Sequence, residues 1–160
     1  MDIFSHALWA NIIFQQADPA TRYTASALSV MPDLIPFVPS MLNKTHLKMW
    51  LSIRKESYDE VAKKVPPWVY RIYDITHSIP IWTAGFLIAW LVMGSIPWAA
   101  FGWLLHTLID IPTHPKNFFP TPFLWPLSNF RVNGINWAVP WFVIVNFGTL
   151  AVLYYFAYFR

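Results

Sequence analysis

Six ionisable side chains lie in or beside apolar stretches of this sequence, where a charge is expensive to hold. A lone histidine in such a stretch usually packs in a hydrogen-bonded network, and an acid between prolines usually caps a helix. Inside a membrane, however, an ionisable residue is by default a candidate functional residue. The six candidates are His6, Asp33, His77, His106, Asp110 and His114.

These residue types favour metal binding over a nucleophilic triad. No serine stands in a nucleophile elbow, and no glycine-rich run could cradle phosphates. Imidazole nitrogens and carboxylate oxygens together suit zinc, with manganese or iron as further options. A metal of this kind lowers the pKa of a bound water toward about 7 and so supplies hydroxide for attack.

One spacing supports a shared ligand set. His106 and Asp110 are four residues apart, so on a helix they lie about 40° apart on one face. An imidazole and a carboxylate placed in this way can share one divalent ion or form a supporting pair beside it. Thr76 and Ser78 flank His77 and could either orient its ring or satisfy the helix backbone.

The composition indicates what kind of molecule holds these residues. The chain has 160 residues, 56% of them hydrophobic and only 12% charged, where a soluble domain carries about 25% charged residues. This excludes disorder, a coiled coil and a multidomain soluble enzyme, and predicts one small all-α membrane domain over residues 1–160. There is no cysteine, hence no disulfide or thiolate site.

The first half of the chain predicts three helical segments. Residues 3–16 are too short to cross a bilayer upright, which takes about 20 residues. Residues 25–42 are apolar but broken by prolines at 32, 36 and 39. Residues 43–64 alternate apolar and lysine faces at helical spacing, which predicts an amphipathic helix on the membrane surface rather than a solvated helix of a soluble domain.

The second half predicts the segments that cross the membrane. Residues 79–111 are nearly all apolar and too long for one crossing, so we expect a helical hairpin that turns at Gly94–Ser95. Counted from Gly94, His77 and Asp110 are then level in depth. Residues 112–134 predict a structured loop, and the charge-free residues 135–159 predict a transmembrane helix.

The basic residues predict orientation rather than a nucleic-acid surface. Seven of the eleven lysines and arginines lie between residues 44 and 71, so the positive-inside rule places residues 43–74 on the cytoplasmic side of an inner membrane. The hairpin then returns residues 112–134 to the same side. We expect membrane lipids as partners and no nucleic acid.

Several motifs in order resemble a known family. They are the opening Met1-Asp2-Ile3-Phe4-Ser5-His6-Ala7-Leu8, Met31-Pro32-Asp33-Leu34, Thr76-His77-Ser78, and Gly102-Trp103-Leu104-Leu105-His106-Thr107-Leu108-Ile109-Asp110, with Pro122-Phe123-Leu124-Trp125-Pro126-Leu127-Ser128 behind them. Together, over most of residues 1–128, they resemble the YdjM-like family of inner-membrane metal-dependent hydrolases. One departure is that Ile72-Tyr73-Asp74 stands where family members often have His-Arg-Gly; Arg71 could substitute, and Asp74 could form a local ion pair.

A looser similarity in ligand order is to zinc-dependent phospholipase C. It implies that Asp33, His77, His106 and Asp110 bind one ion, that His6 belongs to a second ion sharing Asp110, and that His114 belongs to a third. The later His-x-x-x-Glu of those enzymes is missing here, so we expect one ion or two.

The function expected from these observations is metal-dependent hydrolysis of an ester or phosphoester of an amphiphilic, lipid-like substrate. We expect His106 and Asp110 to be the catalytic pair within the ligand set, and Asn129 and Arg131 to hold an anionic head group. The rival is a non-enzymatic membrane protein in which the same residues form a structural metal clip or a polar helix–helix network. A transporter with a broken helix at Asp33 is a third possibility.

Overall fold

The computed structural model describes residues 1–52 and 58–160, and every regular element within these ranges is helical. This confirms the expected all-α class. The elements in order are α1 (Ile3–Ile13), α2 (Pro19–Leu28), α3 (Met31–Met41), α4 (Lys44–Ser52), α5 (Tyr58–Lys64), α6 (Pro67–Thr76), α7 (Ile79–Met93), the short 3-10 turn η1 (Trp98–Ala100), α8 (Phe101–Thr113) and α9 (Pro140–Phe159).

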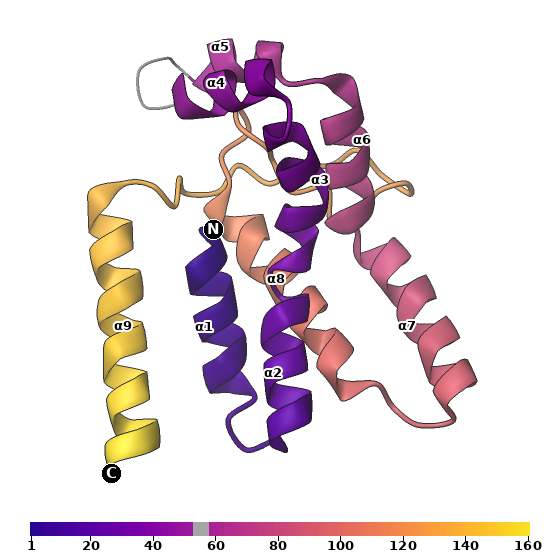
Figure 1. Cartoon of the computed structure of the whole chain (residues 1–160), viewed down its shortest axis with the longest axis vertical. Helices are drawn as coiled ribbons and strands as arrows, with labels where there is room; N and C mark the ends of the chain where they lie inside the picture. The colour runs from indigo at the N-terminus through magenta and orange to yellow at the C-terminus, as the bar shows by residue number, and fades with distance from the viewer. Residues whose placement is uncertain (53–57) are drawn as a thin grey trace.

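The helices form an upper and a lower part (Figure 1). Helices α1, α2, α7, α8 and α9 make up the lower part, and α4 and α5 lie at the top. Helices α3 and α6 pack on each other and connect the two parts. The irregular segment between α8 and α9 crosses the molecule near the boundary, so residues from distant parts of the chain meet there.

The apolar core lies in the upper part. It is built from side chains of α4, α5, α6 and the segment after α8, with aromatic residues packed around it. The buried members are Met49, Val61, Val65, Val69, Tyr73 and Phe119. Burial of such side chains is the usual source of stability for a domain in water.

The lower part is arranged differently, because most of its buried residues are small or polar and most of its large apolar residues lie outside. Its buried residues include Ser5, Ala10 and Ala25, with Ile12 and Leu150 as apolar exceptions, whereas α7 is almost wholly apolar and buries none of its residues. Gly102 brings α8 so close to α2 that a Cβ atom there would lie 2.1 Å from the carbonyl oxygen of Ala25. Close backbone approach through small residues is typical of helices packed in lipid.

In the described ranges, α9 alone is a single helix long and apolar enough to cross a membrane. Helices α6 and α7 pass the same test only as a pair, and they are bent by 56° at the break between them. His77 and Ser78 occupy this break. The structure therefore contains one candidate span, or two if the bent pair counts as one.

The expected hairpin over residues 79–111 has its turn at the expected place. Helix α7 ends at Met93, and Gly94 follows with φ 65°, in the left-handed region that glycine enters most easily. Helix α8 then returns and contacts α7. The expected irregular loop over residues 112–134 is also present, although α8 continues to Thr113 and the irregular part reaches Val139.

Two expected boundaries were wrong, and one helix was not expected. Residues 25–42 are parts of two helices that break at Ser29–Val30 and not at a proline, because Pro32 falls in the first turn of α3, where its missing N–H is not needed. The last helix begins at Pro140 rather than residue 135, since Val139 is extended. Helix α6, which starts at the Pro66–Pro67 pair, was not expected at all.

The expected amphipathic helix over residues 43–64 is found as α4 and α5, which contact each other. Its middle, residues 53–57 with Lys55, lies outside the described residues. Met49 and Val61 are buried in the core, while Leu47 and Leu51 are exposed. The segment thus buries one apolar face against the molecule and leaves other apolar side chains uncovered.

Candidate metal centre

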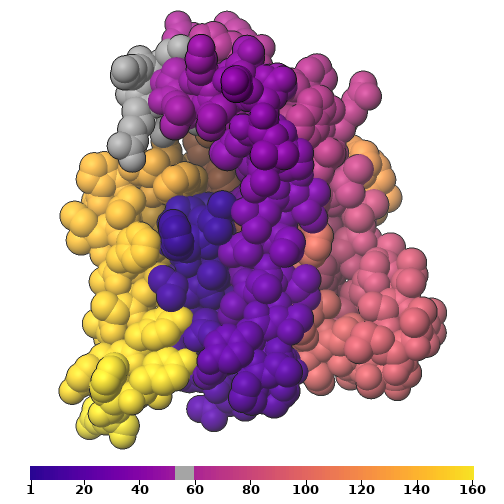
Figure 2. All heavy atoms as spheres, in the orientation of Figure 1, coloured from indigo at the N-terminus to yellow at the C-terminus, as the bar shows by residue number. Residues whose placement is uncertain are grey.

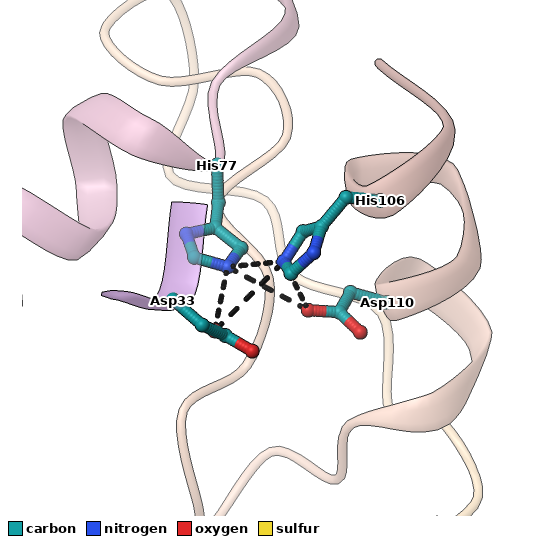
Figure 3. A group of neighbouring side chains, drawn as sticks. All are labelled: Asp33, His77, His106 and Asp110. Atoms are coloured by element: carbon teal, nitrogen blue, oxygen red, sulfur yellow. Dashed lines mark hydrogen bonds and ion pairs between the residues drawn. The ribbon is translucent and has the colours of Figure 1, made fainter. Parts of the chain in front are cut away.

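Two histidines at the boundary between the parts have defined tautomers (Figure 3). Nδ1 of His106 lies 2.6 Å from the carbonyl oxygen of Ser29, and Nδ1 of His77 lies 3.1 Å from that of Tyr73. A carbonyl oxygen only accepts hydrogen bonds, so each Nδ1 carries a proton, and in the neutral ring Nε2 then has the lone pair. The two Nε2 atoms face each other at 3.0 Å.

Two carboxylates converge on the same point. Asp33 Oδ1 lies 3.4 Å from Nε2 of His77 and 3.8 Å from Nε2 of His106. Asp110 Oδ2 lies 3.6 Å and 3.1 Å from the same two atoms. All four residues are buried, and their ligand atoms lie within 4.8 Å of one another. A set of two imidazoles and two carboxylates could hold one divalent ion.

The second oxygen of Asp110 faces a different group of atoms. Its Oδ1 lies 3.0 Å from Nε2 of His6 and 3.5 Å from Nδ1 of His114, and the amino group of Met1 also contacts it. The His6 ring stacks on the His106 ring with centroids 3.8 Å apart. Asp110 therefore lies between two sets of nitrogens, one at each oxygen.

Several of these buried atoms have no hydrogen-bond partner among the described residues. They are both ring nitrogens of His6, Nδ1 of His114 and Oδ2 of Asp110. Buried polar atoms in folded proteins are almost always satisfied, and lone pairs that face each other repel. A cation among them would satisfy the lone pairs, so the donor set fits a metal ion. Burial lowers the pKa of His114 to about 4, which keeps its imidazole neutral at pH 7, the form that binds metals.

Each ligand is positioned by the end or the face of a helix. His106 and Asp110 are one turn apart on α8, as their spacing predicts. Asp33 lies in the first turn of α3, and His6 lies in the first turn of α1, where Asp2 is the N-cap. His77 ends α6 at the bend.

The residues around the bend hold His77 in place. Ser78 caps α7 by accepting from the Ile81 N–H at 3.1 Å, and its hydroxyl donates to the Trp125 carbonyl. The Thr76 hydroxyl donates to the Pro32 carbonyl at 2.9 Å and lies 3.0 Å from Nδ1 of His77. The Tyr73 ring stacks on the His77 ring with centroids 3.7 Å apart. Thr76 thus lies beside the imidazole, while Ser78 serves the helix backbone.

All six ionisable candidates from the sequence meet in this one cluster. The backbone carbonyls of Ser29 and Tyr73, which select the tautomers, were missed because a carbonyl leaves no mark in a sequence. The buried Asn146 was also missed, although an amide in the charge-free helix α9 is a visible signal. It accepts from the Trp9 indole at 2.8 Å and donates to Ser5 at 2.7 Å.

The two candidates for an anion site are not members of the cluster. Arg131 forms an ion pair with Asp74 at 3.2 Å, and Asn129 is exposed in the loop. Asp74 was expected to pair with a close neighbour in sequence, but its partner comes from the loop after α8. A role for Arg131 and Asn129 in binding a head group stays a prediction.

Neither a family model nor a curated protein nor a solved structure matches this chain. The similarity to YdjM-like proteins therefore stays a resemblance of motifs. What the chain does has to be argued from the cluster itself.

Proposed function

We propose that this chain is a membrane-bound hydrolase that uses a divalent metal, zinc in the first place, held by Asp33, His77, His106 and Asp110. Its substrate is an ester or phosphoester of an amphiphile, and its membrane is the cytoplasmic membrane, with residues 43–74 on the cytoplasmic side. The observation that carries the proposal is the pair of histidines whose protonated Nδ1 atoms are bound to carbonyls, so that two Nε2 lone pairs and two carboxylates meet at one buried point.

The chemistry follows from this arrangement. A divalent ion held by Asp33, His77, His106 and Asp110 would lower the pKa of a bound water toward about 7 and so would supply hydroxide. In hydrolysis of an ester or phosphoester, a water oxygen would bond to the carbonyl carbon or phosphorus, the bond to the alcohol would break, and the proton would pass to the leaving alkoxide. The Ser29 and Tyr73 carbonyls hold the imidazoles in the ligating tautomer, and His106 and Asp110 are our candidates for the groups that face the reacting atoms.

Access to the cluster distinguishes this proposal from its rival, a structural clip or a polar network. A structural zinc site is closed by four protein ligands, whereas a catalytic site keeps an open position. The side chains of His77, His106 and Asp110 are fully buried, but those of Asp33 and His114 are each 10% exposed. Both of these residues also line a cavity. This open side favours the enzyme.

Metal content tests the proposal directly. We expect the detergent-purified chain, prepared without chelators, to hold at least one divalent ion by elemental mass spectrometry. Asp110→Asn and His77→Ala should each lose it, because each removes a ligand from a four-ligand set. His46→Ala is the matched control, since His46 lies on α4, outside the cluster. The proposal would be overturned if the wild-type protein contained no metal and the Asp110→Asn and His77→Ala variants were as stable as the wild type.

The same variants separate the enzyme from the clip. If the metal is catalytic, Asp110→Asn should abolish hydrolysis of lipid phosphoesters and leave a folded protein. If it is structural, the same variant should lose folded protein together with the metal. Helical circular dichroism and gel filtration report folding, and phosphate or alcohol release reports activity.

A further inference from the structure

A cavity of about 320 Å³ opens beside the cluster on one side of the molecule. Its walls come from the start of α1, from α3, α4 and α6, and from the irregular segment after α8. In Figure 2 the surface is hollowed above the indigo N-terminal residues, between the purple α3–α4 region and the orange segment. The cavity thus lies where the upper core meets the lower helices.

Most of the wall is apolar, and two of its polar groups are already bonded elsewhere. Its large side chains are Phe37, Met41, Trp50, Phe118, Phe119 and Trp137. The Trp50 indole donates to the Ser40 hydroxyl at 3.1 Å, and the Tyr73 hydroxyl donates to the Phe119 carbonyl at 2.9 Å. A ligand in this space therefore meets hydrocarbon and ring faces.

The inner end of the cavity is different, because Asp33 and His114 of the cluster line it. His114 is buried, and its Nδ1 has no hydrogen-bond partner in residues 1–52 and 58–160. At the outer end, Phe4 and Met41 are apolar and 76% and 40% exposed. The cavity thus joins an apolar rim to the polar cluster.

We propose that this cavity binds one hydrocarbon chain of the substrate, with the ester or phosphoester end at the cluster. The inference rests on the proposed function and names its substrate class: a single-chain amphiphile, or one chain of a lipid. The volume is at the lower end of the range for ligand pockets, which suits one chain rather than two. A peptide would leave its amides unpaired against this wall, at a high cost.

Alkylphosphonates with two to ten carbons are probes that carry both features, an anionic head and a chain of chosen length. The full chain, loaded with zinc in lipid nanodiscs, should bind them about fourfold more tightly for each added methylene, until the cavity is filled. Titration calorimetry gives the affinities. Empty nanodiscs report how much of the increase is partition into lipid.

Two tryptophan substitutions next to each other provide the matched pair. Met41→Trp fills part of the cavity, so the increase in affinity with chain length should stop at a shorter chain. The affinity for ethylphosphonate should stay within twofold of wild type. Leu42→Trp is the control, because Leu42 is 82% exposed and does not line the cavity. It should behave as wild type does.

The outcomes separate this inference from the proposed function. The inference would be overturned if affinity rose with chain length to the same extent in wild type, in Met41→Trp and in empty nanodiscs. This holds even if ethylphosphonate binding required zinc. In a second outcome, affinity stops rising at a shorter chain in Met41→Trp, but removal of zinc leaves the affinity for ethylphosphonate unchanged. This result would establish the cavity as the chain-binding site and overturn the metal-dependent function. Both effects together, with at least a tenfold loss of head-group affinity on zinc removal, would support both.

Discussion

Asp110 is the residue whose two oxygens face different nitrogens, His77 and His106 at Oδ2, His6 and His114 at Oδ1. A carboxylate in this position can bridge two metal ions, as in two-metal hydrolytic sites. We expect His6→Gln to reduce the metal content from two ions per chain to one, while Asp110→Asn removes both. Elemental analysis with protein quantification measures this. Equal metal content in wild type and His6→Gln would show that the Oδ1 side holds no ion.

The site could be predicted at the level of single residues because six ionisable side chains stand out in an apolar sequence. His106 and Asp110 had the spacing of one helix face, and both lie on α8 as expected. The hairpin count also placed His77 level with Asp110, and their Nε2 and Oδ2 atoms lie 3.6 Å apart, but other long-range pairs could not be predicted. Asp74 pairs with Arg131 across the fold, because nothing local in either segment selects that partner.

At the scale of elements, the contact between α2 and α8 depends on Gly102. A Cβ at this position would lie 2.1 Å from the Ala25 carbonyl oxygen, so Gly102→Ala must push the two helices apart. We expect a loss of about 1–3 kcal/mol in the free energy of unfolding, as overpacking usually costs. Because α8 carries His106 and Asp110, zinc affinity should fall as well.

Gly85→Ala on α7 is the control for Gly102→Ala, since no heavy atom lies within 4 Å of the added Cβ. Alanine also favours a helix more than glycine does, so this variant should be as stable as wild type or more stable. Thermal unfolding followed by circular dichroism compares the two. Equal destabilisation by both substitutions would contradict the packing argument.

Helix α9 is connected to the metal centre through α1. Asn146 donates to the Ser5 hydroxyl, which donates to Asp2 at 2.6 Å, and Asp2 caps the helix that carries His6. We expect Asn146→Val to cost about 1–3 kcal/mol, because the half-buried Trp9 indole and the buried Ser5 hydroxyl each lose a hydrogen-bond partner. Val145→Ala, at an exposed neighbouring position, should cost less. Thermal unfolding measures both, and equal losses would contradict a role for the amide.

Helix boundaries were predicted well only where one residue type decides them. Gly94 ends α7 at the expected turn because a left-handed residue favours glycine. Prolines were harder to interpret, because the same residue that breaks a helix interior is also favoured in the first turn. Pro19, Pro67 and Pro140 all occupy such positions, which explains the unexpected α6 and the late start of α9.

The whole molecule combines an upper part that has an aromatic core with a lower part whose surface is apolar. The lysines of α4 and α5 lie at the top, while the α7–α8 turn and the C-terminus lie at the opposite end (Figure 1). The candidate metal cluster lies between these ends, where α3 and α6 connect the two parts. This two-part arrangement was not visible in the sequence, because it depends on which apolar side chains become buried.

Because the chain has no cysteine, its placement in a membrane can be tested with single introduced thiols. Thr45→Cys on α4 and Ser95→Cys in the α7–α8 turn are both at exposed positions. We expect a membrane-impermeant maleimide to label position 45 only from the cytoplasmic side and position 95 only from the other side. Labelling of both positions from one side would contradict the proposed topology.

The order in which the ligands leave the ribosome has a consequence for biogenesis. His6 is made near the start, Asp33 and His77 follow, and His106, Asp110 and His114 come only with α8. A nascent chain that ends before α8 has at most half of the ligand set. Contacts between such distant segments form late, so under the proposed function we expect the metal to bind only after α8 has been made.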